Sequence, residues 1–416
     1  MSRAVRANRA ASSAGAEAGA GSAESTAVSC EIVRVGVFFD GTSNSRRHVG
    51  RANISWHTNV DILERLYENT LSKTKRNIGG VERFINSGSI YLRGIGVNED
   101  GSDDLNGAGR GMGPEGVRQR VEQTVNQLRS EVRRMAQGME VCDLWFDVFG
   151  FSRGAAAARH FSNLAKNGAI GLQKAKPRVK FLGLYDTVVM IGTGVATRGG
   201  DDNVNVRTSN VADKIVHFTA ADEIRANFPL THASTQTHYS IVGVHSDIGG
   251  GYGRGVESGS FEFEHEDYPG LPGYLSRAWG ARDGVAPGDR GSADTLTTEI
   301  QSRWQIHDSG EPISTFRWRA THGLQFVPLK LMYDEAVAAG VPFDPWSDTI
   351  EGINVALSAP LSDYYDALKA NRNAVPESMK KSIRLRYAHV SFNANRAYGF
   401  QANLPRTTGI RQFDRC

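Results

Sequence analysis

The sequence has few cysteines: Cys30, Cys142 and Cys416 are the three in 416 residues. They show neither a CxxC pair nor the spacing of a metal site, and the histidines form no metal constellation either. We therefore expect no metal and no other cofactor. An odd, sparse set of cysteines favours folding in a reducing compartment without disulfide bonds, with Cys142 as an apolar filler in a buried strand.

A strong charge imbalance and long apolar runs are also missing. The formal net charge of +3 is too small for this length to indicate a nucleic-acid partner. No segment approaches the roughly 18 uncharged apolar residues of a membrane-spanning helix, so any membrane contact is expected to be peripheral. Residues 1–29 are rich in Ala, Gly and Ser and lack the apolar core of a secretory signal. We expect them to be a disordered tail.

Six short apolar runs, rich in β-branched and aromatic residues, predict buried strands. They cover residues 32–39, 89–97, 142–150, 179–187, 238–247 and 384–392. Amphipathic helical patterns separate several of them and also follow later in the chain, at 113–138, 323–340 and 353–373. Buried strands that alternate with helices predict an α/β fold, with a mostly parallel central sheet flanked by helices.

This α/β domain is expected to fill residues 30–416, with cap-like loop and helical insertions around 252–380. Within them, residues 252–310 are rich in Gly, Asp, Glu and Pro and have little periodicity, which predicts long loops. The acidic segment 257–268 lacks an ordered ligand spacing, so a solvated loop is expected there rather than a calcium site.

A Gly-x-Ser-x-Gly turn follows the strand predicted at 142–150, in the stretch FGFSRGAAAARHF. Ser152 stands between Gly150 and Gly154, and four alanines follow. This pattern is typical of a nucleophile elbow, where a strained strand-to-helix turn exposes a serine hydroxyl. The alanines would let the helix pack closely on the sheet. We therefore predict that Ser152 is a nucleophile rather than a passive serine in a glycine-rich joint.

A serine nucleophile needs a base that is oriented by an acid, and in α/β-hydrolases the acid precedes the histidine in the chain. Asp247, in a glycine-rich turn, and His389, in the last predicted strand, are the first choice. Asp186 is an alternative acid, at the end of the strand after the serine, and His245 is an alternative base. His245 ranks lower because it alternates with Asp247 along one predicted strand, so that both would have to reach one serine.

The oxyanion of a tetrahedral intermediate needs backbone N–H donors. One is expected from Arg153, at the N-terminus of the helix after the serine. The second is expected from the loop FFDGTSN at residues 38–44, where Gly41 and Thr42 leave backbone N–H groups uncovered. Asp40 is expected to be a turn former or a supporting acceptor there.

Five motifs occur in a recognisable order, namely FFDGTSN, GFSRGAAAARHF, FLGLYDTV, HFTAADEIRANF and VGVHSDIGGGY. In this order they resemble the α/β-hydrolase-fold lipase effectors of bacterial type VI secretion, and YAHVSFNANRAYG resembles the final histidine strand of that family. The resemblance implies an α/β-hydrolase fold and a phospholipase of A1 or A2 type, with a triad of Ser152, Asp247 and His389. One departure is Ser43, which stands where the family usually has glycine.

The resemblance also implies an antibacterial toxin. Such a protein is made in the cytoplasm, is exported without a signal peptide by spike or adaptor components of the secretion system, and acts on phospholipid at a membrane surface in the target cell's periplasm. A cognate immunity protein would protect the producing cell. From the residues alone, two other functions stay open: a carboxylesterase of other specificity, or a non-catalytic interaction protein on a hydrolase scaffold.

Overall fold

The computed structural model describes most of the chain after residue 29. The described residues are 30–49, 56–69, 74–78, 81–170, 172, 175–191, 204–225, 227–264, 282–283, 299–303, 313–391 and 413–414. The tail predicted at 1–29 lies outside them.

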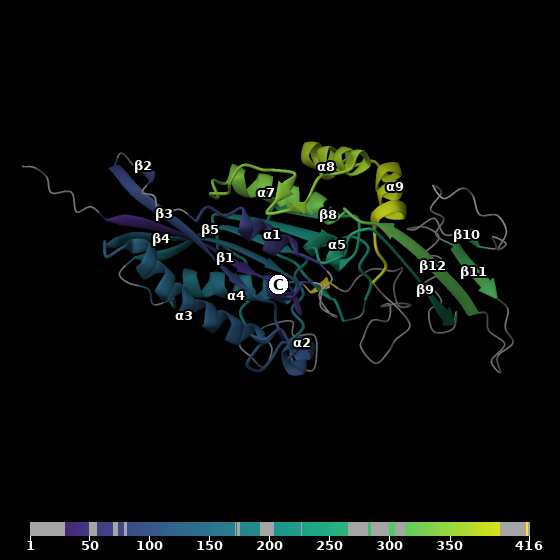
Figure 1. Cartoon of the computed structure of the whole chain (residues 1–416), viewed down its shortest axis with the longest axis horizontal. Coiled ribbons are helices and arrows are strands. Elements are labelled where there is room, and N and C mark those ends of the chain that lie inside the picture. Colours follow the sequence, from purple (N-terminus) through teal and green to yellow (C-terminus); the bar gives the residue numbers. More distant parts are fainter. Residues whose placement is uncertain are drawn as a thin grey trace, which may run out of the picture.

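A seven-stranded sheet forms the centre of the molecule, in the order β2-β3-β1-β4-β5-β6-β8 (Figure 1). Its strands are β1 (Glu31–Phe39), β2 (Thr74–Ile78), β3 (Val81–Leu92), β4 (Val141–Phe151), β5 (Lys176–Tyr185), β6 (Lys214–Ala220) and β8 (Thr237–Ile241). All neighbouring strands pair in parallel except β2, which pairs antiparallel with β3. The predicted α/β fold with a mostly parallel sheet is therefore confirmed.

Helices cover both faces of the sheet (Figure 1). The helices α3 (Val117–Ala136) and α4 (Arg153–Lys166) lie on one face, and α1 (Asn59–Arg65), α7 (Phe326–Ala338) and α8 (Ala359–Asn371) lie on the other. Parallel strands between two helix layers are buried on both sides, which explains why their sequences are apolar throughout.

Each face of the sheet has its own apolar core. Phe149 of β4 packs in the core beneath α7 and α8, whereas its neighbour Val148 packs in the core beneath α3 and α4. Successive side chains of a strand point to opposite faces, so one strand serves both cores. The alanines Ala155 to Ala158 of α4 are fully buried, as the prediction of close helix-to-sheet packing requires.

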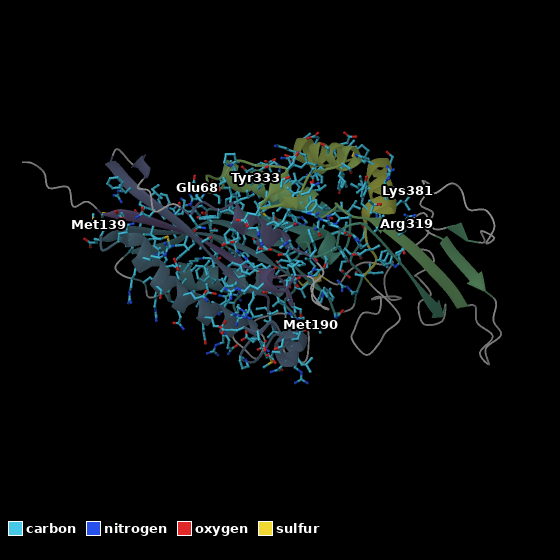
Figure 2. The ribbon with its side chains drawn as sticks, in the orientation of Figure 1. Glu68, Met139, Met190, Arg319, Tyr333 and Lys381 are labelled. Atoms are coloured by element: carbon cyan, nitrogen blue, oxygen red, sulfur yellow. A yellow bond between two sulfur atoms is a disulfide. The ribbon has the colours of Figure 1, made fainter. Side chains whose placement is uncertain are left out.

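A four-stranded arm projects from one end of the molecule, antiparallel except that β10 pairs in parallel with β11 (Figure 1). It has the order β10-β11-β12-β9 and consists of β9 (Val256–Glu264), β10 (Arg282–Asp283), β11 (Glu299–Arg303) and β12 (Ile313–Thr321). The prediction of long loops over 252–310 is therefore wrong for these strands, as is the solvated loop for 257–264. Figure 2 shows Arg319 of β12 near Lys381 of α9 (Glu377–Tyr387), where the arm joins the body.

Two predicted strands near the candidate site are also wrong in part. The segment 384–392 was expected to be a strand, but α9 extends to Tyr387, and His389 follows that helix without belonging to any strand. The strand expected over 238–247 ends at Ile241, and a short helix, α5 (His245–Gly249), follows it. In both segments the spacing of the apolar residues fits a strand or a helix, so periodicity alone could not distinguish the two.

The remaining elements are short. They are η1 (Arg46–His48), α2 (Leu105–Arg110), the hairpin of β13 (Thr349–Ile350) with β14 (Ile353–Asn354), and the parallel pair of β7 (Leu230–Thr231) with β15 (Phe413–Asp414).

Cys30 and Cys142 form a disulfide bond, with their Cα atoms 5.4 Å apart. Cys30 precedes β1 and Cys142 lies near the start of β4, and these two strands pair side by side. The predictions that the cysteines stay unpaired and that Cys142 is only an apolar filler are therefore wrong, and the argument for a reducing compartment loses its basis. The two residues are 112 positions apart, so only the sheet brings them together.

Candidate active site

Ser152 occupies the sharp turn between β4 and α4. Its backbone has φ 58° and ψ −127°, a combination that residues with a side chain rarely adopt. The flanking glycines allow the turn, because a Cβ atom on Gly150 would overlap Gly154 and Ala155, and one on Gly154 would overlap the carbonyl of Asp40. These contacts explain the Gly-x-Ser-x-Gly pattern physically.

The turn places Ser152 beside Asp186 at one edge of the sheet. Phe151 and Tyr185 are paired residues at the ends of β4 and β5, so Ser152 and Asp186 are the next residues on neighbouring parallel strands. The backbone N–H of Ser152 donates to the carbonyl of Tyr185 at 3.0 Å. Asp186 also has a positive φ, 42°, so both chains turn sharply at this point.

Asp247 and His389 come together as expected, although from different elements than predicted. Nδ1 of His389 lies 2.7 Å from Oδ1 of Asp247, and the backbone N–H of His389 donates to Oδ2 at 3.0 Å. The ring of His389 stacks on Tyr252 with centroids 3.6 Å apart. Its Nε2 lies 3.8 Å from a carboxylate oxygen of Glu257 on β9. The pair is buried and tightly held.

Asp186 and His245 form a second buried pair. Nδ1 of His245 lies 2.6 Å from Oδ2 of Asp186, whose Oδ1 accepts the backbone N–H of Ala220 at 2.9 Å. The ring of His245 packs against that of Phe151, the residue before the serine, with centroids 4.6 Å apart. The structure thus pairs the alternative acid with the alternative base, and brings this pair and the first-choice pair to the same edge of the sheet.

The reason for ranking His245 lower does not hold in the structure. It assumed that His245 and Asp247 alternate on a strand and point the same way, but both lie on helix α5. Residues two apart on a helix are rotated by about 200° from each other. His245 and Asp247 can therefore bond different partners, Asp186 and His389.

The loop at 38–44 lies next to the serine turn, but its N–H groups are not equally available. The backbone N–H of Gly41 donates to Oδ1 of Asp40 at 2.7 Å. Within the described part of the chain, the backbone N–H groups of Thr42 and Arg153 have no hydrogen-bond partner. Of the three predicted oxyanion donors, two are therefore open and Gly41 is occupied.

The side chain of Arg153 ties the loop to the serine turn. Its Nε donates to the hydroxyl of Thr42 at 2.9 Å, and its Nη1 donates to the carbonyl of Gly107 in α2 at 3.2 Å. Burial lowers the pKa of Arg153 to about 10, so it stays protonated at neutral pH. Thr42 and Arg153, which carry the two open N–H groups, are thus fixed relative to one another.

Asp40 supports the same loop from beneath. Besides the N–H of Gly41, its carboxylate accepts the hydroxyl of Thr58 at 2.7 Å and that of Tyr91. Burial raises the pKa of Asp40 to about 6, although these donors oppose the shift. The contacts match the expected role of a supporting acceptor.

Ser43 adopts φ 60°, a left-handed conformation that glycine takes up more readily than serine. A side chain costs roughly 1–2 kcal/mol in this region, and glycine's larger loss of chain entropy offsets about half of that gain. We expect Ser43→Gly to raise the free energy of unfolding by about 0.5–1 kcal/mol, measured by urea titration. Ser45→Gly, at an extended φ of −160°, is the control and should give no gain. Equal responses of the two variants would contradict the strain argument.

Two acidic residues that the sequence did not single out hold this region together. Glu223 accepts the backbone N–H of His245 at 3.2 Å and the hydroxyl of Ser391 at 3.0 Å. Asp222 accepts the backbone N–H of Gly243 at 2.8 Å and Nε of Arg384 in α9 at 2.8 Å. Both follow β6, a strand missed in the sequence. The apolar run IVHFTAA, followed directly by Asp222 and Glu223, was the signal in the sequence that could have predicted this strand and the two acidic residues at its end.

Among the described residues, no group of three or more His, Cys, Asp or Glu side chains could hold a metal ion. No helix in the same residues has the length and apolar character to cross a membrane.

Residues 165–263 match the family model for the catalytic domain of Tle1-like phospholipase effectors of the type VI secretion system. The chain is similar to the Tle1-like effectors. The resemblance predicted from the five motifs is therefore confirmed. No curated protein matches the chain.

One solved structure, titled as the Tle1 effector bound to the VgrG spike of the type 6 secretion system, shares the fold. It has 22% sequence identity and a TM-score of 0.60, over 93% of this chain and 94% of Tle1. An uncharacterized protein from Pseudomonas aeruginosa has 20% identity and a TM-score of 0.45, over 85% of this chain and 53% of its own. The likeness to the Tle1 structure shows a shared fold.

Proposed function

We propose that this chain is a serine-dependent phospholipase of A1 or A2 type. The observation that carries the proposal is the backbone of Ser152, held at φ 58° between β4 and α4. Strain of this kind is retained at sites where it positions a reacting group. Two open backbone N–H groups, two buried His–Asp pairs and the match to the Tle1-like catalytic domain support the same chemistry.

For the base and acid, we propose His245 and Asp186. Asp186 directly follows the strand next to β4, and the ring of His245 contacts the residue before the nucleophile. His389, the first choice from sequence, instead stacks on Tyr252 and directs Nε2 toward Glu257. The Asp247–His389 pair is kept as the second candidate, and mutation of the two histidines separates them.

In this assignment the hydroxyl of Ser152 attacks the carbonyl carbon of the ester, and its proton passes to His245. Asp186 orients the ring and stabilises its charged form. The N–H groups of Thr42 and Arg153 donate to the negative oxygen of the intermediate. The C–O bond to the lysophospholipid then breaks, and the leaving alcohol takes the proton from His245. Water cleaves the acyl-serine by the same steps, releasing the fatty acid.

The biological setting follows from the relatives. Because the Tle1 structure contains a VgrG spike, we propose a spike or adaptor partner for delivery of this chain. In this proposal the protein is made in the cytoplasm, acts at the phospholipid surface of the target cell's periplasm and is neutralised by a cognate immunity protein in the producer.

Replacement of Ser152 by alanine tests the proposed function. The variant should lose at least about 1,000-fold in fatty-acid release from phospholipid vesicles, because no other group supplies the attacking oxygen. Its thermal unfolding should stay close to that of the wild type. Mass spectrometry of the products, over several head groups and both acyl positions, distinguishes A1 from A2 activity.

Ser162→Ala is the matched control, since this buried serine of α4 donates only to the carbonyl of Ala158. It should keep wild-type turnover. Undiminished fatty-acid release by Ser152→Ala would refute the proposal. Hydrolysis confined to short, water-soluble esters would instead support a carboxylesterase.

A further inference from the structure

A small pocket lies outside the serine turn, where the arm meets the helical layer. It has a volume of about 230 Å³. The residues lining it include Arg254, His322, Asn354 and Ser358, above an apolar floor that contains Phe326 and Leu361. A drug-sized ligand needs roughly 300–1,000 Å³, so this pocket suits a small group rather than an acyl chain.

The polar side chains that line the pocket are an arginine, a histidine, an asparagine and a serine. None of the lining residues is acidic. Within the described residues, no carboxylate pairs with Arg254, an exposed residue whose guanidinium lies 4.7 Å from the ring centroid of Trp56. Nδ1 of His322 is buried and has no hydrogen-bond partner. The charge of Arg254 without a counter-ion favours an anionic ligand, and Nδ1 of His322 adds a donor when the ring is protonated.

Two helices begin at the pocket, but only α8 offers an open N-terminus among the described residues. In α7 the first N–H groups, those of Phe326 and Val327, donate to the carbonyls of Gly323 and Leu324, and Pro328 has no N–H. Gly323 and Phe326 belong to the turn that starts α7, and Ser358 is the N-cap residue of α8. Each helix has 13 residues, and neither N-cap side chain bonds to its own helix. The first N–H groups of a helix and its dipole attract oxyanions, phosphate in particular.

The pocket adjoins the candidate active site. Arg254 follows the glycine-rich segment after α5, in which Tyr252 stacks on His389. The backbone N–H of Tyr252 donates to Oε1 of Gln325, in the turn that starts α7. A group bound in the pocket would therefore lie against the segment that leads from the active-site helix to the arm.

We propose that this pocket binds the head-group phosphate of the phospholipid substrate. The inference rests on the proposed phospholipase function. Arg254 contacts the phosphate oxygens with its guanidinium, and His322 donates through Nδ1 once that nitrogen is protonated. The N-terminus of α8 faces the same oxygens. An ester without a phosphate makes none of these contacts, so the pocket sets a preference for phospholipid over neutral esters.

The test compares two substrates in the full-length protein: dihexanoylphosphatidylcholine and p-nitrophenyl butyrate, which has no phosphate. Arg254→Gln should lower the ratio of their kcat/KM values by about 10- to 100-fold, as expected for a lost charged hydrogen bond. Arg254→Lys should recover part of the ratio. Arg118→Gln, an exposed arginine of α3 on the other face, removes the same charge and should leave the ratio unchanged.

A binding measurement tests the phosphate pocket independently of ester hydrolysis. In the Ser152→Ala protein, glycerol 3-phosphate should bind in calorimetry, and Arg254→Gln should abolish the binding. Burial, His389 and Arg254 hold the pKa of His322 below its ordinary value, although a backbone hydrogen bond with Gly253 opposes the shift. The phosphate should raise that pKa, measured by NMR of the ring. We expect this binding even if the wild type hydrolyses no ester. Absence of hydrolysis together with binding would refute only the proposed function.

Three results would overturn the assignment. One is equal loss of activity on both substrates in Arg254→Gln. Another is the absence of phosphate binding to the Ser152→Ala protein. The third is binding of inorganic phosphate that neither competes with dihexanoylphosphatidylcholine nor responds to Arg254→Gln, since the phosphate would then occupy a different place.

Discussion

His245→Asn should lower kcat/KM for phospholipid by about 1,000-fold, within the range of 100 to 10,000 typical of a lost general base. The reason is the position of His245, bonded to Asp186 at 2.6 Å and packed on Phe151. Asp186→Asn should have a similar effect, because the ring would lose its orientation and the partner of its charged form.

His389→Asn is the matched control for this experiment. It removes an equally buried histidine with an equally close aspartate, Asp247 at 2.7 Å. The expected loss is about tenfold or less, arising from looser packing of the segment that holds Tyr252. A large loss in His389→Asn with a small one in His245→Asn would return the catalytic role to Asp247 and His389. Circular dichroism should confirm that each variant folds.

Asp147→Ala should destabilise the protein by about 3–5 kcal/mol, the largest effect on stability that we expect from one polar residue. Asp147 is fully buried in β4 and accepts two hydrogen bonds from Arg34, at 2.7 and 2.9 Å. It also accepts the hydroxyl of Tyr67 at 2.8 Å. Its removal would leave a buried guanidinium without a partner. Urea unfolding measures the change.

Two controls separate the buried charge from other causes. The double variant Arg34→Met with Asp147→Leu should lose less stability than Asp147→Ala, because no charge is left unpaired. Asp213→Ala removes a more exposed carboxylate that pairs with Arg178 and Lys180, and should cost about 1 kcal/mol or less. If Asp147→Ala matched Asp213→Ala, the Arg34 pair would not be a major source of stability.

The parts of the fold that were predicted well from sequence are those in which the pattern of residues fits only one kind of structural element. Strands such as β4 are apolar on both faces because helices cover both sides, and that pattern is visible in the residues themselves. The serine turn was also visible, since only glycine fits at Gly150 and Gly154. In both cases the residues of the segment itself were sufficient for the prediction.

The prediction failed where the outcome depends on distant parts of the chain. Only three of the nine residues of β9, VESGSFEFE, are apolar, and their pairing partners in β12 lie 49 to 65 positions later. The residues before His389 suit a strand or a helix, and packing of α9 against the body selects the helix. Asp186 and His245 were named only as an alternative acid and an alternative base, and their pairing with each other depends on contacts between distant segments of the chain.

The disulfide between Cys30 and Cys142 has a topological consequence. It joins positions 112 residues apart, so the intervening chain becomes a closed loop. If the protein were pulled by its N-terminus through a pore that admits one extended strand, passage would stop at Cys30, because the loop would have to follow as two strands at once. Reduction of this one bond would remove the obstacle. The oxidation state therefore decides whether the chain can be threaded as a single strand or must travel folded.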